Sequence, residues 1–492
     1  MNGAPGSSVL SGSASHATPE ASLQDILVFE NDTAILDFRC PETGVLLWPL
    51  IRVVVIRMIM SDMLYGTSLD GIAAAPSVSW SAWGTLARSV MHNMRAVPSA
   101  RVCIISTAVA NQFVDGKWFN RLTDPFALRL PGETLVVEEP FEWRWQMPRY
   151  FEAVRFMAPR LAFGAIVGRL RVSAAERASA VRLVDLVLTR SRALLAWDCG
   201  ALRRKQLVEM LGRKLAALPT QFHAHEKWLD AIRPDLLLVT GACYGPHSPL
   251  LVAANRRGIT TAEYQHGAVS RGHDAYNFAP ALANDAALRE SLPAAFLGYG
   301  SWWHEQFNAP VSKHVIGNPH RTRQLSNLNR QVSRRRRILI LSDGIEFQLY
   351  LRLAEELAAA LTNSEFDVVL RPHPLERSSV AQTYGRAVAQ IELDQQEDLY
   401  TSLTNAHSVI SEVSTGLFEA VGVAEKVFVW DTPKARFGFP SHPFHRFQTV
   451  PELVDLITDE QAGRLAPEAL NAIWAADWAS SYDGFLARLG IR

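Results

Sequence analysis

Cysteine is scarce in this sequence. The 492 residues contain four cysteines, which lie far apart at Cys40, Cys103, Cys199 and Cys243. No two of them form a C-x-x-C pair, so the sequence indicates neither a zinc site nor a disulfide framework. Few and scattered cysteines are typical of a reducing compartment, and we therefore expect a cytoplasmic location.

An excess of charge of either sign is also absent. The chain has 49 Lys and Arg residues and 49 Asp and Glu residues, which gives a formal net charge of zero. This balance does not favour nucleic acid as a partner, and we expect none. The one local concentration is Arg334 to Arg337, just before an apolar run. It is typical of a solvated linker, and attraction to anionic lipid or to a phosphorylated substrate is the alternative.

Long hydrophobic runs are missing as well. The best candidate, Val45 to Met60, contains Pro49, Arg52 and Arg57 and is shorter than the roughly 20 apolar residues that a membrane-spanning helix needs. The segment favours an amphipathic helix docked against its own domain, with contact to a membrane surface as the second possibility. The N-terminus lacks a basic region followed by an apolar core. We therefore expect no secretory signal and a disordered tail over residues 1–20.

The length predicts more than one domain, because single hydrophobic cores stop growing beyond about 250–300 residues. In the first half, residues 101–106 form a β-branched run that predicts a strand, and residues 172–218 show helical periodicity. Residues 115–125 mix turn formers, charges and aromatics without a period, so we predict a loop there. This loop either carries acceptor contacts or is held in place by its aromatic residues.

A strand-helix-strand unit follows. Residues 234–241 show an apolar strand pattern, residues 249–257 a helical pattern, and residues 259–264 a second strand pattern. Such a βαβ unit predicts a parallel sheet, and ligands of parallel sheets bind at the carboxyl ends of the strands. Gln265-His266-Gly267 stands at that place.

His266 is therefore a candidate site residue. Arg271, His273 and Tyr276 follow within about ten residues, so polar groups converge where a core would have apolar ones. Gly267 permits a tight turn directly after the histidine. This pattern favours a catalytic or substrate-orienting role over that of a histidine that caps the strand and bonds to a neighbouring carbonyl.

A second set of strands predicts a second α/β domain. Apolar strand patterns occur at residues 338–341, 366–370, 408–410 and 426–430. The polar stretch from His320 to Arg337 precedes them, and we place the domain boundary near residue 322. The predicted organisation is an N-terminal Rossmann-like, acceptor-side domain with helical additions (residues 21–322), a C-terminal Rossmann-like donor domain (residues 323–465) and a closing helical tail (residues 466–492).

Polar residues also follow the strands of the second set. Asp343 follows the first of them, where its carboxylate is either a base for an acceptor hydroxyl or the N-cap of the next helix. Arg371 and His373 follow the second, and prolines beside them stiffen the chain. A guanidinium fork and an imidazole suit phosphate oxygens.

A predicted helix start follows the third of these strands. Ser414, Thr415 and Gly416 stand at this start, where backbone N–H groups and hydroxyls can bind an anion. A plain capping role for Ser414 is the alternative. Glu419, one turn further on, is placed to reach ribose hydroxyls.

Together these motifs resemble a known group. Gln265-His266-Gly267 in one α/β domain, with Arg371-Pro372-His373-Pro374 and Ser411 to Ala420 in the next, resembles the two-domain GT-B glycosyltransferases of bacterial capsule and lipopolysaccharide synthesis. The His-Pro motif is similar to that of bacterial sialyltransferases and Kdo transferases. The His-Gly motif is similar to that of teichoic-acid glycerophosphotransferases. The resemblance covers roughly residues 230–435 and implies two Rossmann-like domains that face each other across a cleft.

The resemblance also implies roles for the motif residues. His373 would bind the donor phosphate, and Ser414 and Thr415 would hold the same phosphates. His266 would match the histidine proposed as base in the glycerophosphotransferases, and Asp343 the acidic base of the sialyltransferases. The sialyltransferase motif usually reads acid-acid-glycine, whereas serine precedes Asp343 here, so the base stays open between the two residues.

The function implied is transfer of a sugar from a nucleotide-activated donor to a growing surface polysaccharide or a lipid-linked saccharide. We expect no metal, because the sequence has no D-x-D motif, and no cofactor, because the nucleotide sugar is a substrate. Peripheral contact with the cytoplasmic face of the inner membrane is an added possibility. The alternatives are a CDP-polyol phosphotransferase, a nucleotide-sugar 2-epimerase and a non-catalytic protein of polysaccharide assembly.

Overall fold

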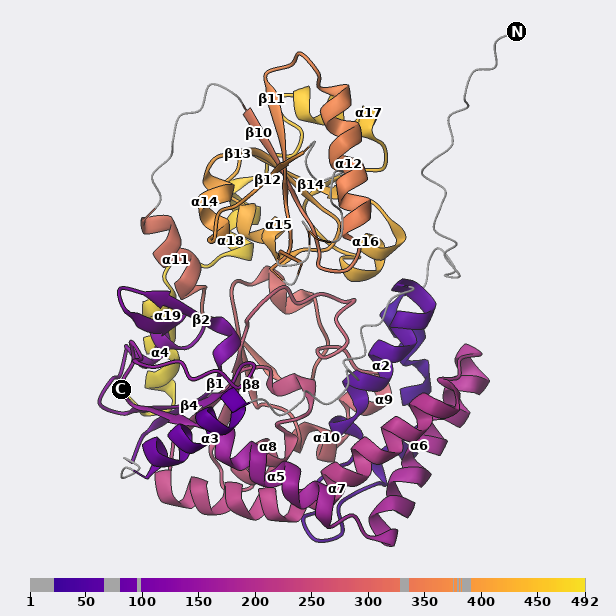
Figure 1. Ribbon diagram of the computed structural model, residues 1–492, viewed down its shortest axis with the longest axis vertical. Helices are drawn as coiled ribbons and strands as arrows, with labels where there is room; N and C mark the ends of the chain where they lie inside the picture. Colours follow the sequence, from indigo (N-terminus) through magenta and orange to yellow (C-terminus); the bar gives the residue numbers. More distant parts are fainter. Residues whose placement is uncertain are drawn as a thin grey trace.

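The computed structural model describes residues 22–65, 80–94, 99–327, 336–374, 376–377, 380, 382 and 391–491. The tail predicted for residues 1–20 lies outside this part, as do Arg334 and Arg335 of the arginine run. The described chain forms two parallel sheets, one above the other in Figure 1, with helices on both of their faces.

The first sheet has seven parallel strands in the order β5-β4-β1-β6-β7-β8-β9. Its central strands β1, β6 and β8 are mostly apolar and buried, as expected for parallel strands that are covered on both faces, whereas the edge strand β9 is polar and partly exposed. They span Val102–Thr107 (β1), Thr134–Glu139 (β4), Val154–Phe156 (β5), Leu236–Val239 (β6), Thr260–Tyr264 (β7), Ala295–Gly298 (β8) and Ser312–Val315 (β9). The chain moves outward from β1 in one direction, then crosses over and moves outward in the other, which is Rossmann topology with one added strand.

Helices cover the first sheet and extend below it (Figure 1). The longer ones are α2 (Arg52–Met60), α3 (Trp80–Asn93), α5 (Ala158–Leu170), α6 (Ala174–Leu195), α7 (Gly200–Ile232) and α8 (Ser248–Asn255). The shorter ones are α1 (Leu23–Ile26), α4 (Asp124–Ala127), α9 (Pro280–Ala283) and α10 (Ala286–Glu290). The helical periodicity predicted for residues 172–218 corresponds to α6 and the first part of α7.

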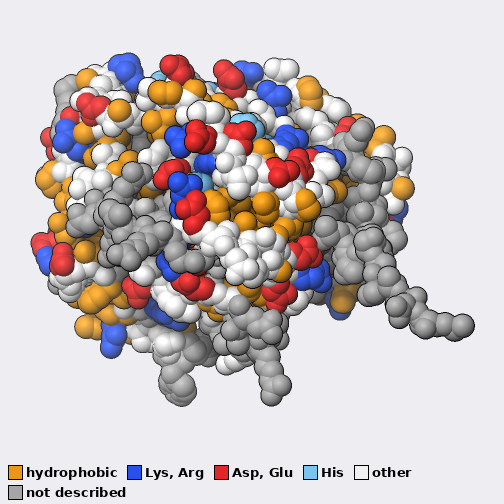
Figure 2. Space-filling view, turned by 90° about the horizontal axis from the view of Figure 1, so that it is seen from above, with side chains coloured by type: hydrophobic (Ala, Val, Ile, Leu, Met, Phe, Trp, Pro, Cys, Tyr) orange, Lys and Arg blue, Asp and Glu red, His pale blue; other side chains and the backbone are white. Residues whose placement is uncertain are grey.

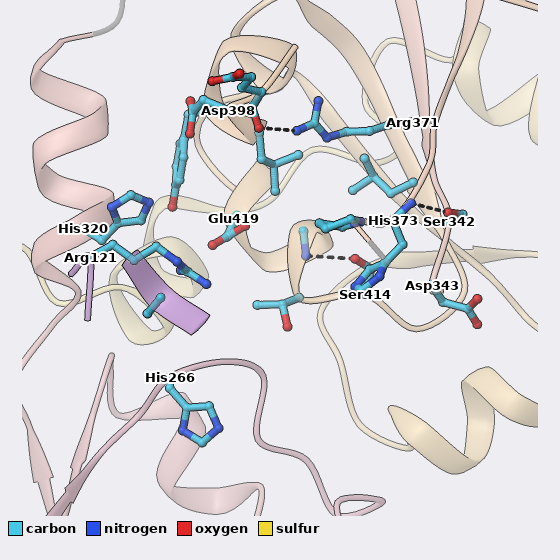
Figure 3. Close-up of a pocket in the computed structure, with 18 of the residues that line it drawn as sticks. Arg121, His266, His320, Ser342, Asp343, Arg371, His373, Asp398, Ser414 and Glu419 are labelled. Carbon is cyan, nitrogen blue, oxygen red and sulfur yellow. Dashed lines mark hydrogen bonds between the residues drawn. The ribbon is translucent and has the colours of Figure 1, made fainter. Parts of the chain in front are cut away.

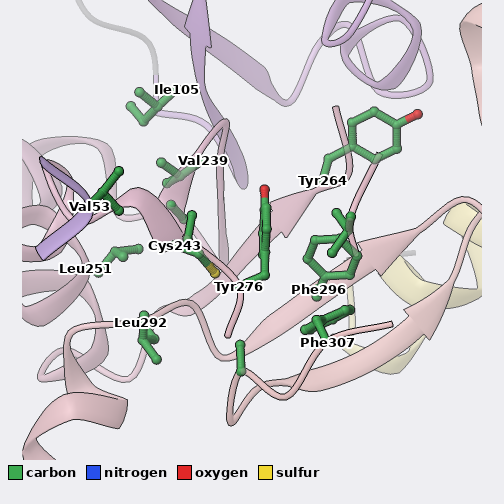
Figure 4. Close-up of a cluster of buried hydrophobic side chains, with 14 of the residues drawn as sticks. Val53, Ile105, Val239, Cys243, Leu251, Tyr264, Tyr276, Leu292, Phe296 and Phe307 are labelled. Atoms are coloured by element: carbon green, nitrogen blue, oxygen red, sulfur yellow. The ribbon is translucent and has the colours of Figure 1, made fainter. Parts of the chain in front are cut away.

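The core of the first domain reaches up to the carboxyl ends of its strands. Figure 4 shows part of this core, in which Tyr276 lies beside Phe296 and Phe307. Tyr276 is almost fully buried, and its hydroxyl donates a hydrogen bond of 2.6 Å to Glu263 on β7. Buried Tyr hydroxyls usually find such a partner. This bond connects the hydrophobic core to the polar strand end that carries His266.

The second sheet has six parallel strands in the order β12-β11-β10-β13-β14-β15. They span Arg336–Leu341 (β10), Phe366–Arg371 (β11), Glu392–Leu393 (β12), Ala406–Ser411 (β13), Lys426–Trp430 (β14) and His445–Phe447 (β15). This order is again that of a Rossmann domain, whose ligands bind where the strand order reverses, between β10 and β13. The prediction of two Rossmann-like domains is therefore confirmed.

Short helices accompany the second sheet: α12 (Phe347–Ala360), α14 (Leu399–Thr404), α15 (Thr415–Ala420), α16 (Pro433–Gly438) and α17 (Val450–Thr458). Figure 2 views the molecule from the side of this domain, and basic and acidic side chains are interspersed over the described part of that face. This face therefore presents no large field of one sign, as the balanced composition leads one to expect.

The C-terminal segment joins the two domains. It contains α18 (Pro467–Ile473) and α19 (Trp478–Arg488), and α19 returns to the first domain (Figure 1). Arg129 pairs with Asp483 there. Between the domains, the ring of Phe418 on α15 lies 4.6 Å from that of Trp303, and the indole N–H of Trp474 donates to the Phe418 carbonyl. The first domain and the C-terminal segment are thus packed directly against α15 of the second domain.

The loop predicted for residues 115–125 is wrong in part. Strands β2 (Asn111–Val114) and β3 (Lys117–Asn120) form an antiparallel hairpin, and α4 begins at Asp124. The turn consists of Asp115 and Gly116, both with positive φ (50° and 79°). An Asp-Gly pair is a strong hairpin signal, because tight two-residue turns need positive φ at both positions.

Two other segments bear on predictions made from the sequence: the helix predicted within Val45 to Met60 and the polar stretch after residue 319. In α2, Arg52 forms a fully buried ion pair of 2.6 Å with Glu30, and Arg57 pairs with Asp274. The helix is therefore docked within its own domain. The polar stretch after residue 319 begins as helix α11 (Pro319–Ser326), which Asn318 caps. Among the described helices, none combines the length and the apolar character needed to span a membrane.

Candidate active site

A cavity of about 690 Å³ lies between the carboxyl ends of the two sheets. Figure 3 shows His266 and Arg121 entering it from the first domain, while His373 and Ser414 enter from the second. Of the predicted site residues, eight line this cavity: His266, Asp343, Arg371, His373, Ser414, Thr415, Gly416 and Glu419. The predicted cleft between the two domains is thus confirmed.

His266 lies at the end of β7 and keeps 26% of its side chain exposed, on the cavity side. Its Nδ1 atom is buried without a hydrogen-bond partner and lies 3.6 Å from the Glu263 carboxylate. This leaves Nε2 as the ring nitrogen that can face the cavity. Enclosure by the protein lowers the pKa of His266 to about 4, and the nearby His273 and Arg121 act in the same direction. The imidazole is therefore neutral at neutral pH.

Glu263 is the buried acid behind His266. It accepts hydrogen bonds from the Cys243 amide at 2.8 Å and from the Tyr276 hydroxyl at 2.6 Å. Burial raises the pKa of Glu263 to about 7, although these hydrogen bonds oppose the rise. A carboxyl group in this place can hold the Nδ1 side of His266 and so select the tautomer with a basic Nε2.

Gln265 and Gly267, which the sequence pattern groups with His266, lie outside the lining of the cavity. Gln265 is fully buried; its side-chain oxygen accepts from the Tyr299 amide at 2.9 Å, and its amide group donates to the Gly267 carbonyl at 2.9 Å. Gly267 faces the second domain, since a Cβ atom there would lie 3.7 Å from Thr415 Oγ1. Both residues therefore fix the loop that carries His266.

Asp343 lines the cavity wall but is held in a buried ion pair. Its Oδ2 atom lies 2.7 Å from Lys434 Nζ, and its Oδ1 accepts from the Ile345 amide at 2.9 Å. The same ammonium group lies 2.8 Å from Glu346 and 2.7 Å from Glu412. Only 2% of the Asp343 side chain is exposed. This is close to the capping role that the sequence left open, and it occupies both carboxylate oxygens.

Arg371 has a different environment from the predicted one. Its guanidinium group donates to the Asp394 carboxylate at 2.5 Å, to Ser402 at 2.9 Å and to the backbone carbonyls of Gln396 and Glu397. The side chain is 7% exposed. These donors are used within the domain, so Arg371 shapes the loop before α14 rather than offering its fork to a phosphate.

His373 is held at the cavity by its own backbone. Its amide donates to Ser342 Oγ at 2.7 Å and to Glu376 at 3.1 Å. Gly344 has φ +85°, and a Cβ atom there would lie 2.7 Å from His373 Nδ1. Only glycine fits both the backbone conformation and the space. Burial lowers the pKa of His373, although Asp343 opposes this shift.

The start of α15 forms the wall opposite His266. Ser414 Oγ accepts from the Gly416 amide at 3.1 Å, which is the capping role left open by the sequence. Thr415 Oγ1 accepts from the Ala268 amide at 3.2 Å, across the boundary between the domains. The loop after His266 is thus bonded directly to the predicted phosphate-binding turn. Glu419 lies one turn further along the cavity, and burial raises its pKa.

The sequence reasoning missed Arg121, His320, Tyr299 and Tyr400, which also line the cavity. No hydrogen bond or ion pair joins the Arg121 guanidinium to any residue that the structure describes. Burial lowers the pKa of His320 to about 3, and its Nδ1 is buried without a hydrogen-bond partner. The Asp-Gly turn before Arg121 was the signal that could have placed this arginine on an ordered hairpin.

Comparison with known proteins gives matches only to solved structures. No protein-family model matches the sequence, and no curated protein matches it. The fold is similar to that of the UDP-GlcNAc 2-epimerase from Neisseria meningitidis bound to UDP-GlcNAc, with a TM-score of 0.39 and 12% identity over 80% of this chain and 100% of that one.

Two further similar structures are named as a glycosyltransferase and as a polymerase. The glycosyltransferase SnogD from Streptomyces nogalater has a TM-score of 0.37 and 13% identity over 80% of this chain and 100% of that one. The wall teichoic acid polymerase TagF has a TM-score of 0.41 and 10% identity over 84% of this chain and 98% of that one. Similarity at these identities and scores assigns no activity to this chain.

Proposed function

We propose that this protein transfers a sugar from a nucleotide-activated donor to a hydroxyl group of a growing surface polysaccharide or glycolipid. The observation that carries the proposal is the cavity between two Rossmann-like domains, with a neutral His266 on one wall and His373 and the start of α15 on the other. Such domains bind nucleotides where their strand order reverses. An acceptor held against the first sheet would meet the donor in this space.

The second domain would hold the donor. His373 and the backbone amide of Thr415 would face the phosphate that leaves with the nucleotide. As the bond from the anomeric carbon to the phosphate oxygen breaks, that oxygen takes the electron pair, and fixed donors stabilise the developing charge. Glu419 would accept hydrogen bonds from ribose hydroxyls. Hydrogen-bond donors of this kind need no divalent ion.

His266 is the better candidate for the base. The new bond forms between the acceptor oxygen and the anomeric carbon, and the proton of the acceptor hydroxyl must move to a nearby group. His266 is neutral and offers Nε2 to the cavity, with Glu263 behind Nδ1. Asp343 already has Lys434 at 2.7 Å and a backbone amide at 2.9 Å. Both carboxylate oxygens of Asp343 are therefore occupied, and an acceptor hydroxyl would have to compete with these partners for them.

A panel of CMP-, CDP-, UDP- and GDP-linked sugars tests the proposal. Purified protein should release nucleotide from one of them, slowly by hydrolysis when no acceptor is present, and should do so in EDTA. CDP-glycerol belongs in the panel, because release from it alone would show a polyol-phosphate transferase. Epimerised UDP-GlcNAc without free UDP would show a 2-epimerase. Neither binding nor release across the panel would leave a non-catalytic protein.

Two variants separate the proposed roles. His373→Ala should weaken nucleotide binding, since it removes a group from the phosphate side. His266→Ala should leave nucleotide binding unchanged and reduce turnover, by about 100-fold or more if it is the general base. Equal losses of binding in both variants would contradict the assignment of His266 as the base.

A further inference from the structure

The first domain places one unpaired cation in the cavity. Arg121 directly follows β3, and its guanidinium group has no hydrogen bond or ion pair with any described residue. Figure 3 shows the side chain extending from its strand toward the space between Glu419 and His266. A buried or half-buried guanidinium usually has an anionic partner. The charge of Arg121 opposes the rise in the pKa of the nearby Glu419, but no hydrogen bond or ion pair joins the two side chains. The guanidinium donors therefore remain available to a ligand.

The backbone beneath Arg121 is fixed. Asn120 is fully buried, and its side chain donates to Ser106 Oγ, the Thr107 carbonyl and Asn111 Oδ1 at 2.8 to 3.0 Å. Its amide donates to the buried Asp124 carboxylate at 2.8 Å. The amides of Leu122 and Thr123 donate in turn to Asn120 Oδ1, so hydrogen bonds on both sides of Arg121 hold the turn from which it projects. Because the backbone is already ordered, anion binding by Arg121 needs no ordering of the loop.

A second polar group beside Arg121 also lacks a partner. His320 on α11 is only 6% exposed, lines the same cavity, and has a buried Nδ1 atom without a hydrogen-bond partner. Buried polar atoms are rarely left unpaired in folded proteins. The guanidinium of Arg121 and the imidazole of His320 can therefore both form hydrogen bonds with a ligand in this part of the cavity.

The charges of the lining residues indicate what the ligand is. Among the described residues that line the cavity, two carry a guanidinium group, Arg121 and Arg371. The guanidinium of Arg371 donates its hydrogen bonds to Asp394, to Ser402 and to the loop before α14. Burial lowers the pKa of His373, which disfavours its charged form. A phosphorylated donor held by the second domain would thus find its unpaired positive charge on the first domain.

We propose that Arg121 binds the phosphate of the nucleotide-linked donor from across the cleft, so that donor binding and contact between the two domains are coupled. This inference rests on the proposed function and names the anion that it requires at this position. Arg121 would stabilise the charge on the leaving phosphate while Glu419, beside it, holds the adjoining ribose. The first domain would then supply a donor contact as well as the acceptor surface.

The test compares ligands with and without phosphate. CDP, UDP and GDP, the nucleosides cytidine, uridine and guanosine, and inorganic pyrophosphate are titrated into wild-type protein, Arg121→Met and Arg121→Lys. The diphosphate that binds should lose about tenfold or more in affinity in Arg121→Met, as for one charge-assisted hydrogen bond. Its nucleoside should bind both proteins equally. Arg121→Lys should keep part of the phosphate-dependent gain.

Lys117→Met is the matched control. Lys117 lies on the same hairpin and also loses one positive charge, but its side chain is 45% exposed and pairs with Glu152 on the surface. It should bind all ligands like wild-type protein. No hydrogen bond or ion pair joins the Arg121 guanidinium to a described residue, and the bond from the Arg121 amide to the Ala110 carbonyl does not involve the side chain. Arg121→Met should therefore also keep the wild-type melting temperature, which shows that a loss of binding is not a loss of folding.

The outcomes separate the two proposals. Wild-type affinity of Arg121→Met for the nucleoside diphosphate would overturn the role of Arg121 and leave the proposed function intact. Loss of pyrophosphate binding in Arg121→Met, with no nucleotide bound by either protein, would keep the anion site and overturn the nucleotide-dependent function. Absence of any binding to wild-type protein would overturn both.

Discussion

Removing the ammonium group of Lys434 is the sharpest perturbation of the second domain. Its Nζ atom lies within 2.7 to 2.8 Å of Asp343, Glu346 and Glu412. The side chains of Lys434, Asp343 and Glu412 are 6%, 2% and 2% exposed, so water screens this cluster little. Burial opposes the charged lysine, yet the carboxylates of Glu412 and Asp343 raise its pKa above the usual value. One cation therefore holds three carboxylates from two different loops, the one between β10 and α12 and the one after β13.

The expected cost of Lys434→Met follows from that geometry. Removing one partner of a buried ion pair typically costs about 3–5 kcal/mol, because the remaining charge stays buried without compensation. We expect a loss in this range for the free energy of unfolding at pH 7.5. Burial already raises the pKa of Glu412 in the wild-type protein, although Lys434 opposes this. Without the lysine, the folded-state pKa of Glu412 should rise further.

The sign of the pH dependence distinguishes this explanation from simple loss of packing. A carboxyl group whose pKa is higher in the folded than in the unfolded state stabilises the fold below the unfolded-state value and loses that contribution as pH rises through the folded-state value. Lys434→Met should therefore recover stability as pH is lowered from 7.5 towards 5, by up to about 1.4 kcal/mol per pH unit for each such carboxyl.

Urea unfolding followed by tryptophan fluorescence at pH 5 and pH 7.5 provides the assay. Lys117→Met, which removes a surface pair, should cost no more than about 1 kcal/mol at either pH. Adding Glu412→Gln to Lys434→Met should recover part of the loss, since one uncompensated charge is removed. A loss below about 1 kcal/mol at pH 7.5, or a difference from wild type that grows at pH 5, would refute the reasoning.

Three further predictions concern the cavity. Gly344→Ala should weaken nucleotide binding by displacing His373, whereas Gly258→Ala, at a similar φ of +70° but with nothing within 4 Å, should leave binding unchanged; equal effects would contradict the proposed contact. If neutral His266 is the base, kcat/KM should stay constant from pH 7.5 to about 5 and fall tenfold per pH unit below about 4; a fall beginning near pH 6.5 would show an unperturbed histidine. His320 has a folded-state pKa of about 3 against an ordinary value of 6.5, so it costs the folded state up to about 2.7 kcal/mol as pH falls from 6.5 to 4.5. His320→Asn should lose less stability over that interval than wild type in urea melts, and identical pH dependence would contradict the pKa shift.

The strands were predictable because parallel strands covered on both faces read as short apolar runs. β7, β10, β11, β13 and β14 all fall within one or two residues of their predicted places. The polar edge elements were less predictable. The hairpin of β2 and β3 has two short strands with mixed polarity, so periodicity gives no signal and only the Asp-Gly turn identifies it. The short β12 escaped prediction because two residues carry no period at all.

In the candidate site, the positions of residues were predictable from the sequence, whereas their interactions were not. A residue that follows a strand is brought to the sheet edge by the topology alone, which is why His266, His373 and Ser414 could be placed in one cavity from the sequence. What each side chain does there depends on partners far away in the chain. Arg371 and Asp343 look like ligand groups in sequence.

In the folded protein, the side chains of Arg371 and Asp343 are instead paired with other residues of the second domain. The guanidinium of Arg371 bonds to Asp394, and the carboxylate of Asp343 pairs with Lys434. Arg121 is the converse case, because an arginine in an irregular polar stretch is usually solvated. It becomes a candidate ligand group only because buried Asn120 fixes the turn beneath it and no described residue pairs with it. A charged residue in a loop is therefore informative about function once its possible protein partners are known, and the most informative one here is the arginine that has none.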